Sequence, residues 1–135
     1  LNNLCRQAIE EQKLILHEEN SVERNFISMS NVCLGIEHFM RLPDKDLGPS
    51  PINLCSEMSH SLQHLACLIT TRCKTVLGYS PELKSFNQDK GNNFNRRLNL
   101  CTQKIEKTGL TLQANLEQEI DNTLLFCKKH FYQKN

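Results

Sequence analysis

The first 41 residues contain no proline, and apolar side chains recur along them at alternating intervals of four and three residues. The repeat runs over Leu1, Cys5, Ala8, Gln12, Ile15, Glu19, Val22, Phe26, Met29, Cys33, Ile36 and Met40, and only Gln12 and Glu19 break its apolar character. A strict seven-residue repeat drifts by about 20° per heptad against a straight helix, so a helix with this pattern supercoils around a neighbour. The spacing therefore predicts one long coiled-coil helix over residues 1–41. A break near residue 20, with Asn20 as N-cap and Glu23 three residues later, is the alternative and gives two shorter helices.

Segments rich in proline and glycine divide the rest of the chain. Residues 42–51 hold three prolines and a glycine, a density that the interior of a helix does not accept. Ser50-Pro51 is typical of an N-cap followed by the first helical position, and the apolar stripe that follows it predicts a second helix over residues 51–77. Ser80-Pro81 repeats this pattern and predicts a short helix around residues 81–86.

A last apolar stripe runs from Phe94 to Phe131 and predicts a helix of about 40 residues, with Gly109 at a close contact between helices. The elements together predict an all-α fold, namely an elongated bundle of three long helices, or four if the first breaks near residue 20, plus the short helix around 81–86. We expect residues 1–135 to form a single helical-bundle domain, cut from a larger protein.

The chain has seven cysteines, and six of them lie on these apolar stripes. The six are Cys5, Cys33, Cys55, Cys73, Cys101 and Cys127, whereas Cys67 points elsewhere. Buried free cysteines behave as small hydrophobic residues, while small secreted domains use cysteines in even number as disulfides. The odd count, together with the absence of an Asn-x-Ser/Thr sequon, predicts an intracellular location, either cytoplasmic or nuclear.

The best candidate for a metal site is a group of three residues at spacings of four and three. His60, His64 and Cys67 would share one helical face and could hold zinc, with a fourth ligand from His17 or His38. The competing interpretation is a polar outer face on which these residues happen to lie. The sequence shows no strand, Gly-rich phosphate loop or Gly-flanked serine, so we expect no enzyme and assign no catalytic, cofactor-binding or metal residue, and no cofactor.

Charge excludes further classes of protein. The 16 basic and 15 acidic residues are interspersed and give a net charge of +1, unlike the basic stripe of a nucleic-acid binder. No apolar run approaches the ~18 residues that span a bilayer.

Ser50-Pro51 and Ser80-Pro81 are also candidate sites for proline-directed kinases, although a helix start at each pair explains them equally well.

The function that these patterns favour is a non-enzymatic protein–protein interaction module: a scaffold, adaptor or oligomerisation domain that binds an amphipathic partner helix in a groove between two helices. The second predicted helix is shorter than the other two, which suggests a partner helix or a homodimer that covers the protruding ends. The first alternative is a secreted, four-helix, cytokine-like ligand with two or three disulfides. The second is a zinc-binding regulatory bundle.

Overall fold

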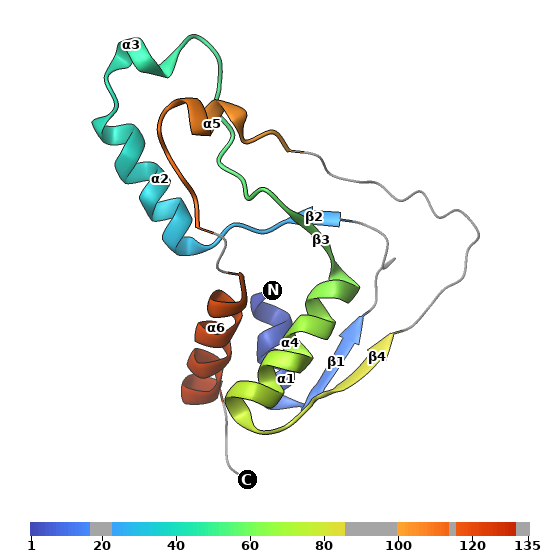
Figure 1. Cartoon of the computed structure of the whole chain (residues 1–135). Coiled ribbons are helices and arrows are strands. Elements are labelled where there is room, and N and C mark those ends of the chain that lie inside the picture. The colour runs from blue at the N-terminus through green and yellow to red at the C-terminus, as the bar shows by residue number, and fades with distance from the viewer. Residues whose placement is uncertain (17–22, 86–99, 114–115, 132–135) are drawn as a thin grey trace, which may run out of the picture.

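The computed structural model describes residues 1–16, 23–85, 100–113 and 116–131 of the chain, which form two lobes (Figure 1). In chain order the elements are α1 (Asn2–Glu10), β1 (Lys13–Leu16), β2 (Glu23–Asn25), α2 (Met29–Arg41), α3 (Asp44–Leu47), β3 (Ser59–Ser61), α4 (Leu62–Leu77), β4 (Glu82–Ser85), α5 (Gln103–Lys107) and α6 (Leu116–Phe131). We call α1, β1, α4, β4 and α6 the core lobe. The α2 lobe consists of α2, α3, α5 and the segments that connect them. The antiparallel β2–β3 pair lies between the lobes.

The core lobe contains the main hydrophobic core. Twelve buried side chains form it, from α1, β1, α4 and α6: Leu4, Cys5, Ala8, Ile9, Leu14, Leu16, Ala66, Ile69, Cys73, Ile120, Leu124 and Cys127. Each helix contributes residues three or four positions apart, as a helix with one buried face must. Burial of each large side chain contributes about 1.5–3 kcal/mol, so this cluster supplies most of the hydrophobic stabilisation in the described chain.

The predicted helix over residues 1–41 is wrong, because the chain leaves helical geometry after Glu10. Gln12 has a φ of 53°, and the next four residues form strand β1, which pairs in parallel with β4 in a register that sets Lys13 opposite Glu82. Leu14 and Leu16 are both fully buried, which is the period of two that a strand imposes. The partner strand β4 is some 70 residues away in sequence, so no local sequence pattern predicts this pairing. The predicted break near residue 20 lies outside the described residues.

The second predicted helix begins later than expected. Residues 51–58 are not helical, and α4 starts after Ser61, whose side chain accepts a hydrogen bond from the backbone N–H of His64 at 3.1 Å. Ser61 is therefore the N-cap, and the prediction that Ser50 caps this helix is wrong. The expected end is confirmed, because Gly78 caps the helix in the left-handed conformation with a φ of 81°.

The last two predicted helices also differ from the structure. Strand β4 takes the place of the short helix around 81–86, within the described part up to residue 85. The expected final helix is divided into α5 and α6, because Gly109 adopts a φ of 85° and turns the chain. A Cβ at Gly109 would meet nothing within 4 Å, so this glycine serves a turn and not a close helix contact. The elongated all-α bundle and the coiled coil are thus both wrong, and the fold is mixed α/β with short helices.

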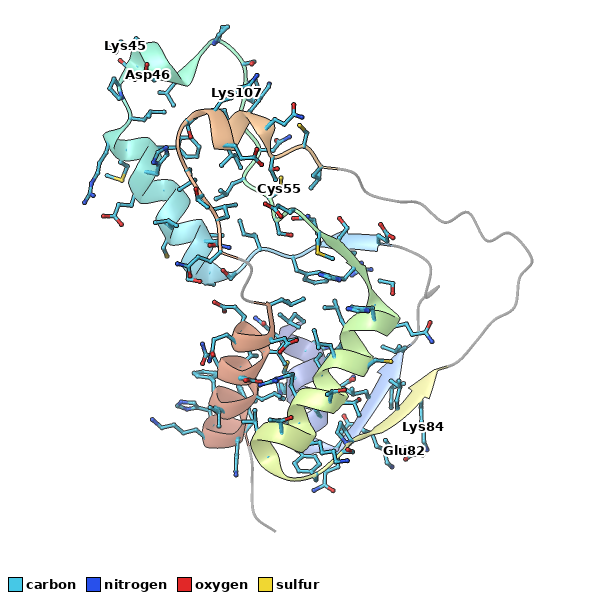
Figure 2. All side chains as sticks on the ribbon, in the orientation of Figure 1. Lys45, Asp46, Cys55, Glu82, Lys84 and Lys107 are labelled. Carbon is cyan, nitrogen blue, oxygen red and sulfur yellow. The ribbon has the colours of Figure 1, made fainter. Side chains whose placement is uncertain are left out.

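The α2 lobe has a much smaller core. Its buried apolar side chains, among the described residues, are Cys55, Ile105 and Leu110. Figure 2 shows Cys55 on the segment that passes beneath α5. Of the six cysteines expected in the core, four are buried, whereas Cys33 and Cys101 are exposed. Few apolar side chains of the α2 lobe are therefore fully buried.

Candidate functional site

Helix α2 is attached to its own lobe by polar contacts. The Asn31 side chain forms a closed pair with the backbone of Gln113: Nδ2 donates to the carbonyl oxygen at 2.9 Å, and Oδ1 accepts from the N–H at 3.1 Å. Seven residues later, about two helical turns further on, His38 Nε2 lies 3.0 Å from Thr108 Oγ1. The Thr108 hydroxyl donates its proton to the carbonyl of Ile105 at 2.6 Å, so it accepts from His38 and fixes the Nε2–H tautomer.

A glycine lets α2 approach the loop that carries Leu54. Gly35 lies on the same helical face as Asn31 and His38, and it is buried. A Cβ placed on Gly35 would lie 2.8 Å from Leu54 Cδ2 and 2.9 Å from Leu54 Cδ1, well inside van der Waals contact. The face of α2 that meets the protein thus includes an amide, a glycine and an imidazole, flanked by the half-buried Val32 and Phe39. Leu54 packs against the space that the glycine leaves.

The opposite face of α2 is apolar and exposed. Met29, Cys33, Ile36 and Met40 form this face, which we call the α2 stripe. The exposed fraction is 69% for Met29, 55% for Ile36 and 82% for Met40, and Cys33 is also exposed. At about 100° per residue these positions fall within an arc of ~60°, nearly opposite the inward-facing residues. Helix α2 is thus amphipathic in the reverse sense, with its polar side inward and its apolar side in solvent.

All three methionines of the chain are exposed. Two of them, Met29 and Met40, belong to the α2 stripe, and Met58 has 64% of its surface exposed. Methionine is unbranched and polarisable, so it fits irregular apolar partners, and it is over-used at binding surfaces. Scattered exposed apolar residues are normal, but here every methionine of the chain lies outside the core.

A large open cleft lies between the two lobes and begins at the first residue of the α2 stripe. Its volume is about 1660 Å³, and its lining includes residues of α1, α4, α6 and the segment before α2. The apolar side chains that line it include Phe26, Ile27, Met29, Met58, Leu112 and Leu116. We call it the interlobe cleft. Because Met29 belongs both to the cleft and to the stripe, the two form one continuous surface.

Charged residues fix one wall of the interlobe cleft. Arg72 of α4 forms a bidentate contact with the Asp121 carboxylate of α6, with Nε 2.7 Å from Oδ1. A second carboxylate, that of Glu117, lies 3.3 Å from Arg72 Nη1. Paired planar contacts of this kind hold the two helices in a defined orientation. The charges of Arg72, Asp121 and Glu117 therefore pair with one another on this wall.

The proposed zinc ligands are only partly brought together. The rings of His60 and His64 stack with centroids 4.9 Å apart and planes 10° from parallel, and both line the interlobe cleft. Burial, and to a smaller extent the charge of His64, lowers the pKa of His60, while the carboxylate of Glu23 opposes this effect. Cys67 is exposed on α4.

The remaining ligands of the expected zinc site do not complete it. His38 lies on α2 and bonds to Thr108, and His17 lies outside the described residues. Across the described ranges no three His, Cys, Asp or Glu side chains are grouped so that they could hold a metal ion. What the histidine pair contributes to the cleft is a flat, stacked aromatic surface.

The buried thiols are unsuited to nucleophilic chemistry. Burial raises the pKa of Cys5 to about 12 and that of Cys73 to about 11, and it also raises the pKa of Cys127. Only a thiolate is an effective nucleophile, so near neutral pH these three groups are inert thiols. They act as small apolar side chains between α1, α4 and α6.

Sequence reasoning identified the α2 stripe as apolar but assigned it to the wrong side of the helix. Met29, Cys33, Ile36 and Met40 were all part of the four–three repeat that predicted a packed seam. The signal that could have reversed the assignment lies on the other face, where Asn31 and His38 carry strong hydrogen-bonding groups and Gly35 permits close approach. Those three residues share a face at spacings of four and three as well.

No protein-family model matches the chain, and no curated protein matches it either. In the part of the chain that the structure describes, no helix has the length and apolar character needed to cross a membrane.

Proposed function

We propose that this chain is a non-enzymatic protein-interaction module that binds an amphipathic helix of a partner protein along the α2 stripe and in the interlobe cleft. The observation that carries the proposal is the reversed amphipathicity of α2. Asn31, Gly35 and His38 face the protein, while the apolar stripe faces solvent. We further propose an intracellular scaffold or adaptor role, in keeping with the odd number of cysteines.

The geometry of the stripe favours a helix as the partner. Its positions alternate at four and three residues, which is the spacing that packs one helix against another through knobs in holes. Helix α2 has 13 residues and is therefore ~20 Å long at 1.5 Å per residue. An amphipathic helix recognised by residues at i, i+3, i+4 and i+7 is a common ligand of such surfaces.

The size of the two surfaces favours a partner that contacts both. The stripe alone exposes on the order of 400 Å² of apolar surface, within the ~300–600 Å² that is usual for the largest patch of a monomer, which often has a function. A stable complex buries about 800 Å² of total surface per partner, so a partner seated on the stripe must also cover surface beside it. The cleft, at about 1660 Å³, exceeds the ~300–1,000 Å³ of typical small-molecule pockets. A helix that lies in the cleft and continues along α2 fits both dimensions.

The thin core of the α2 lobe gives such binding an energetic basis. With Cys55, Ile105 and Leu110 as its buried apolar residues in the described segments, this lobe has little hydrophobic stabilisation of its own. A partner that covers Ile36 and Met40 would add the apolar burial that the lobe lacks. Binding and stability of the α2 lobe should therefore be coupled.

Site-specific photo-crosslinking in cells tests the proposal. A photoreactive amino acid is placed at position 36 or 40, and at position 84 as the control, because Lys84 is exposed on β4 in the other lobe (Figure 2). We expect adducts at positions 36 and 40, absent at 84, whose crosslinked peptide has apolar residues at helical spacing. M40D combined with I36D should abolish the adduct formed from position 29. Adducts equally strong at position 84, or a crosslink only to a second copy of this chain, would overturn the proposal.

The two rival functions make different demands. A four-helix cytokine needs a bundle of long helices, which the described fold does not have. Among the seven cysteines, two disulfides leave three free thiols and three disulfides leave one. A zinc-regulated module needs a third ligand beside His60 and His64. Titration of thiols under denaturing, non-reducing conditions and measurement of bound zinc separate these alternatives from an intracellular interaction module.

A further inference from the structure

Ser50-Pro51 lies in an exposed segment that no regular element explains. The pair follows α3 and the turn at Gly48, and residues 51–58 are not helical. Ser50 therefore does not cap a helix, which was the structural role that the sequence suggested for it. Both Ser50 and Pro51 are exposed.

A cation already lies against this serine. Lys104 of α5 places its Nζ 3.0 Å from Ser50 Oγ and 3.3 Å from the carbonyl oxygen of Pro51. The ammonium group thus bridges two residues of the exposed segment to a helix 54 positions away in sequence. An anion on Ser50 would meet this ammonium without any rearrangement of the backbone.

The second Ser-Pro pair provides a contrast within the same chain. Ser80 is exposed, but Pro81 is buried. The adjoining backbone is also held, since the N–H of Glu82 donates to the carbonyl of Gln12 at 2.9 Å where β4 begins. An enzyme that selects serine by the proline after it must contact that proline ring. Pro51 can be contacted in this way, whereas Pro81 is covered.

We propose that Ser50 is a phosphorylation site for a proline-directed protein kinase, and that Lys104 binds the phosphate. In the transfer, Ser50 Oγ forms a bond to the γ-phosphorus of ATP. The bond from that phosphorus to the β–γ bridging oxygen breaks, and ADP leaves with the electron pair. The hydroxyl proton passes to a base of the kinase. The product carries about −1.5 to −2 charges and three strong acceptor oxygens. The Lys104 ammonium, whose partner at Ser50 is a neutral hydroxyl, would then form an ion pair with the phosphate.

The consequence is a tighter link between two segments of the α2 lobe. Segment 50–56 carries Leu54, which packs against α2 at Gly35, and Cys55, one of the few buried apolar residues of the lobe. A phosphate held by α5 would restrict this segment and with it the support of α2. The proposal goes beyond the binding of a partner helix and does not depend on it.

In vitro phosphorylation of the purified full chain tests the site. The chain is incubated with a purified proline-directed kinase and Mg·ATP, and phosphopeptides are mapped by mass spectrometry. We expect one phosphate per chain, on Ser50, lost completely in S50A and retained in S80A. A synthetic peptide of residues 76–85 should be modified at Ser80, which shows that folding, not sequence, protects that serine. Failure to modify Ser50 in the folded chain, or equal modification of Ser80 there, would overturn the assignment.

Phosphorus NMR of the modified chain tests the role of Lys104. The second pKa of a phosphoserine is about 6, and a neighbouring ammonium group lowers it because it favours the dianion. We expect a lower second pKa in the wild-type chain than in K104Q. K107Q is the matched control, because Lys107 is an exposed lysine on the same helix, and it should leave the pKa unchanged. The same pKa in the wild type and in K104Q would show that Lys104 does not bind the phosphate.

Discussion

His38 and Met40 are two residues apart on α2 and face opposite sides of it. The His38 ring bonds to Thr108 of the neighbouring segment, while 82% of the Met40 surface is in solvent. In an ordinary surface helix the two roles are exchanged, because burial of the thioether chain is favourable and burial of the imidazole requires a partner. In the isolated chain, α2 therefore leaves apolar surface exposed that an ordinary surface helix would bury. This is what we expect of a helix whose apolar face is covered by another molecule.

Substitution on the α2 stripe should leave the folding of the isolated chain almost unchanged. Ile36 is exposed, so Ile36→Ser is expected to alter the free energy of unfolding by no more than about 0.5 kcal/mol. Leu124 is fully buried in the core lobe, and Leu124→Ala should cost about 2–5 kcal/mol. Urea denaturation followed by circular dichroism measures both. A large loss of stability in Ile36→Ser would mean that Ile36 is part of the core and that α2 is oriented differently.

Gly35 and Leu54 should show strong energetic coupling. In a helix interior, Gly→Ala is favourable by about 1 kcal/mol, but at Gly35 the new methyl group would overlap with the Leu54 side chain, at a cost of about 1–3 kcal/mol. We therefore expect Gly35→Ala to be neutral or destabilising in the wild type. In the Leu54→Ala background the overlap is gone, and the same change should be stabilising.

A double-mutant cycle with Gly35→Ala, Leu54→Ala and the combined variant measures this coupling by denaturant titration. The two changes are predicted to be less harmful together than their separate effects imply. Strict additivity would contradict the close approach of α2 to the loop of residue 54. Hydrogen exchange of the α2 amides would show whether the effect is confined to the α2 lobe, as its small core leads us to expect.

Local sequence patterns are sufficient to predict a helix that packs on one apolar face, and they also predict the end of α4 at Gly78. The stretch from Leu65 to Gly78 and the stripe through Ile120 and Cys127 were both recognised, because their side chains recur at helical spacing. The part that failed depends on contacts distant in sequence. Residues Lys13–Leu16 form a strand only because β4 pairs with them, and nothing within four residues of Leu14 distinguishes that strand from one more helical turn.

The residues of the candidate surface could be predicted from local spacing, but the side of α2 on which they lie could not, because it depends on contacts distant in sequence. The four–three spacing identified the residues of the stripe correctly, but the side of α2 that faces the protein is decided by Asn31 and its partner Gln113, 82 positions away. A polar residue that finds two backbone partners can be buried at little cost. Periodicity alone ranks apolar residues as the buried ones and cannot foresee such a pair.

Asn31 should therefore be essential for the attachment of α2. Asn31→Ala removes two hydrogen bonds and leaves the N–H and carbonyl of Gln113 without them, at an expected cost of about 1–3 kcal/mol. Asn122→Ala is a suitable control, because Asn122 is exposed and accepts a single bond from Gln118. Amide hydrogen exchange should accelerate along α2 in Asn31→Ala and remain normal in α4. Faster exchange throughout the core lobe would instead mean that the two lobes unfold as one unit.

Thiol labelling should separate the cysteines into two groups. Cys33, Cys67 and Cys101 are exposed, whereas Cys5, Cys55, Cys73 and Cys127 are buried. In the native chain at neutral pH we expect three thiols to react rapidly with a maleimide and four to react only through unfolding. Seven should react in denaturant without reductant. A single reactive thiol in denaturant would support the secreted alternative with three disulfides.

Alkaline pH should destabilise the chain through the buried thiols. The pKa of Cys5 is raised to about 12 and that of Cys73 to about 11, in each case chiefly by burial, while an unfolded thiol ionises near pH 8.5. Between these values the unfolded chain has lost the proton that the folded chain keeps. The free energy of unfolding is therefore unaffected by these groups below about pH 8 and falls above it, by up to ~1.4 kcal/mol per pH unit for each thiol.

Denaturation by urea at pH 8, 9 and 10 measures how steeply the free energy of unfolding falls with pH. Cys5→Ala should make the slope shallower, whereas Cys67→Ala, at an exposed position, should leave it unchanged. Equal slopes in the wild type and in both variants would show that Cys5 ionises as readily in the folded chain as in the unfolded one.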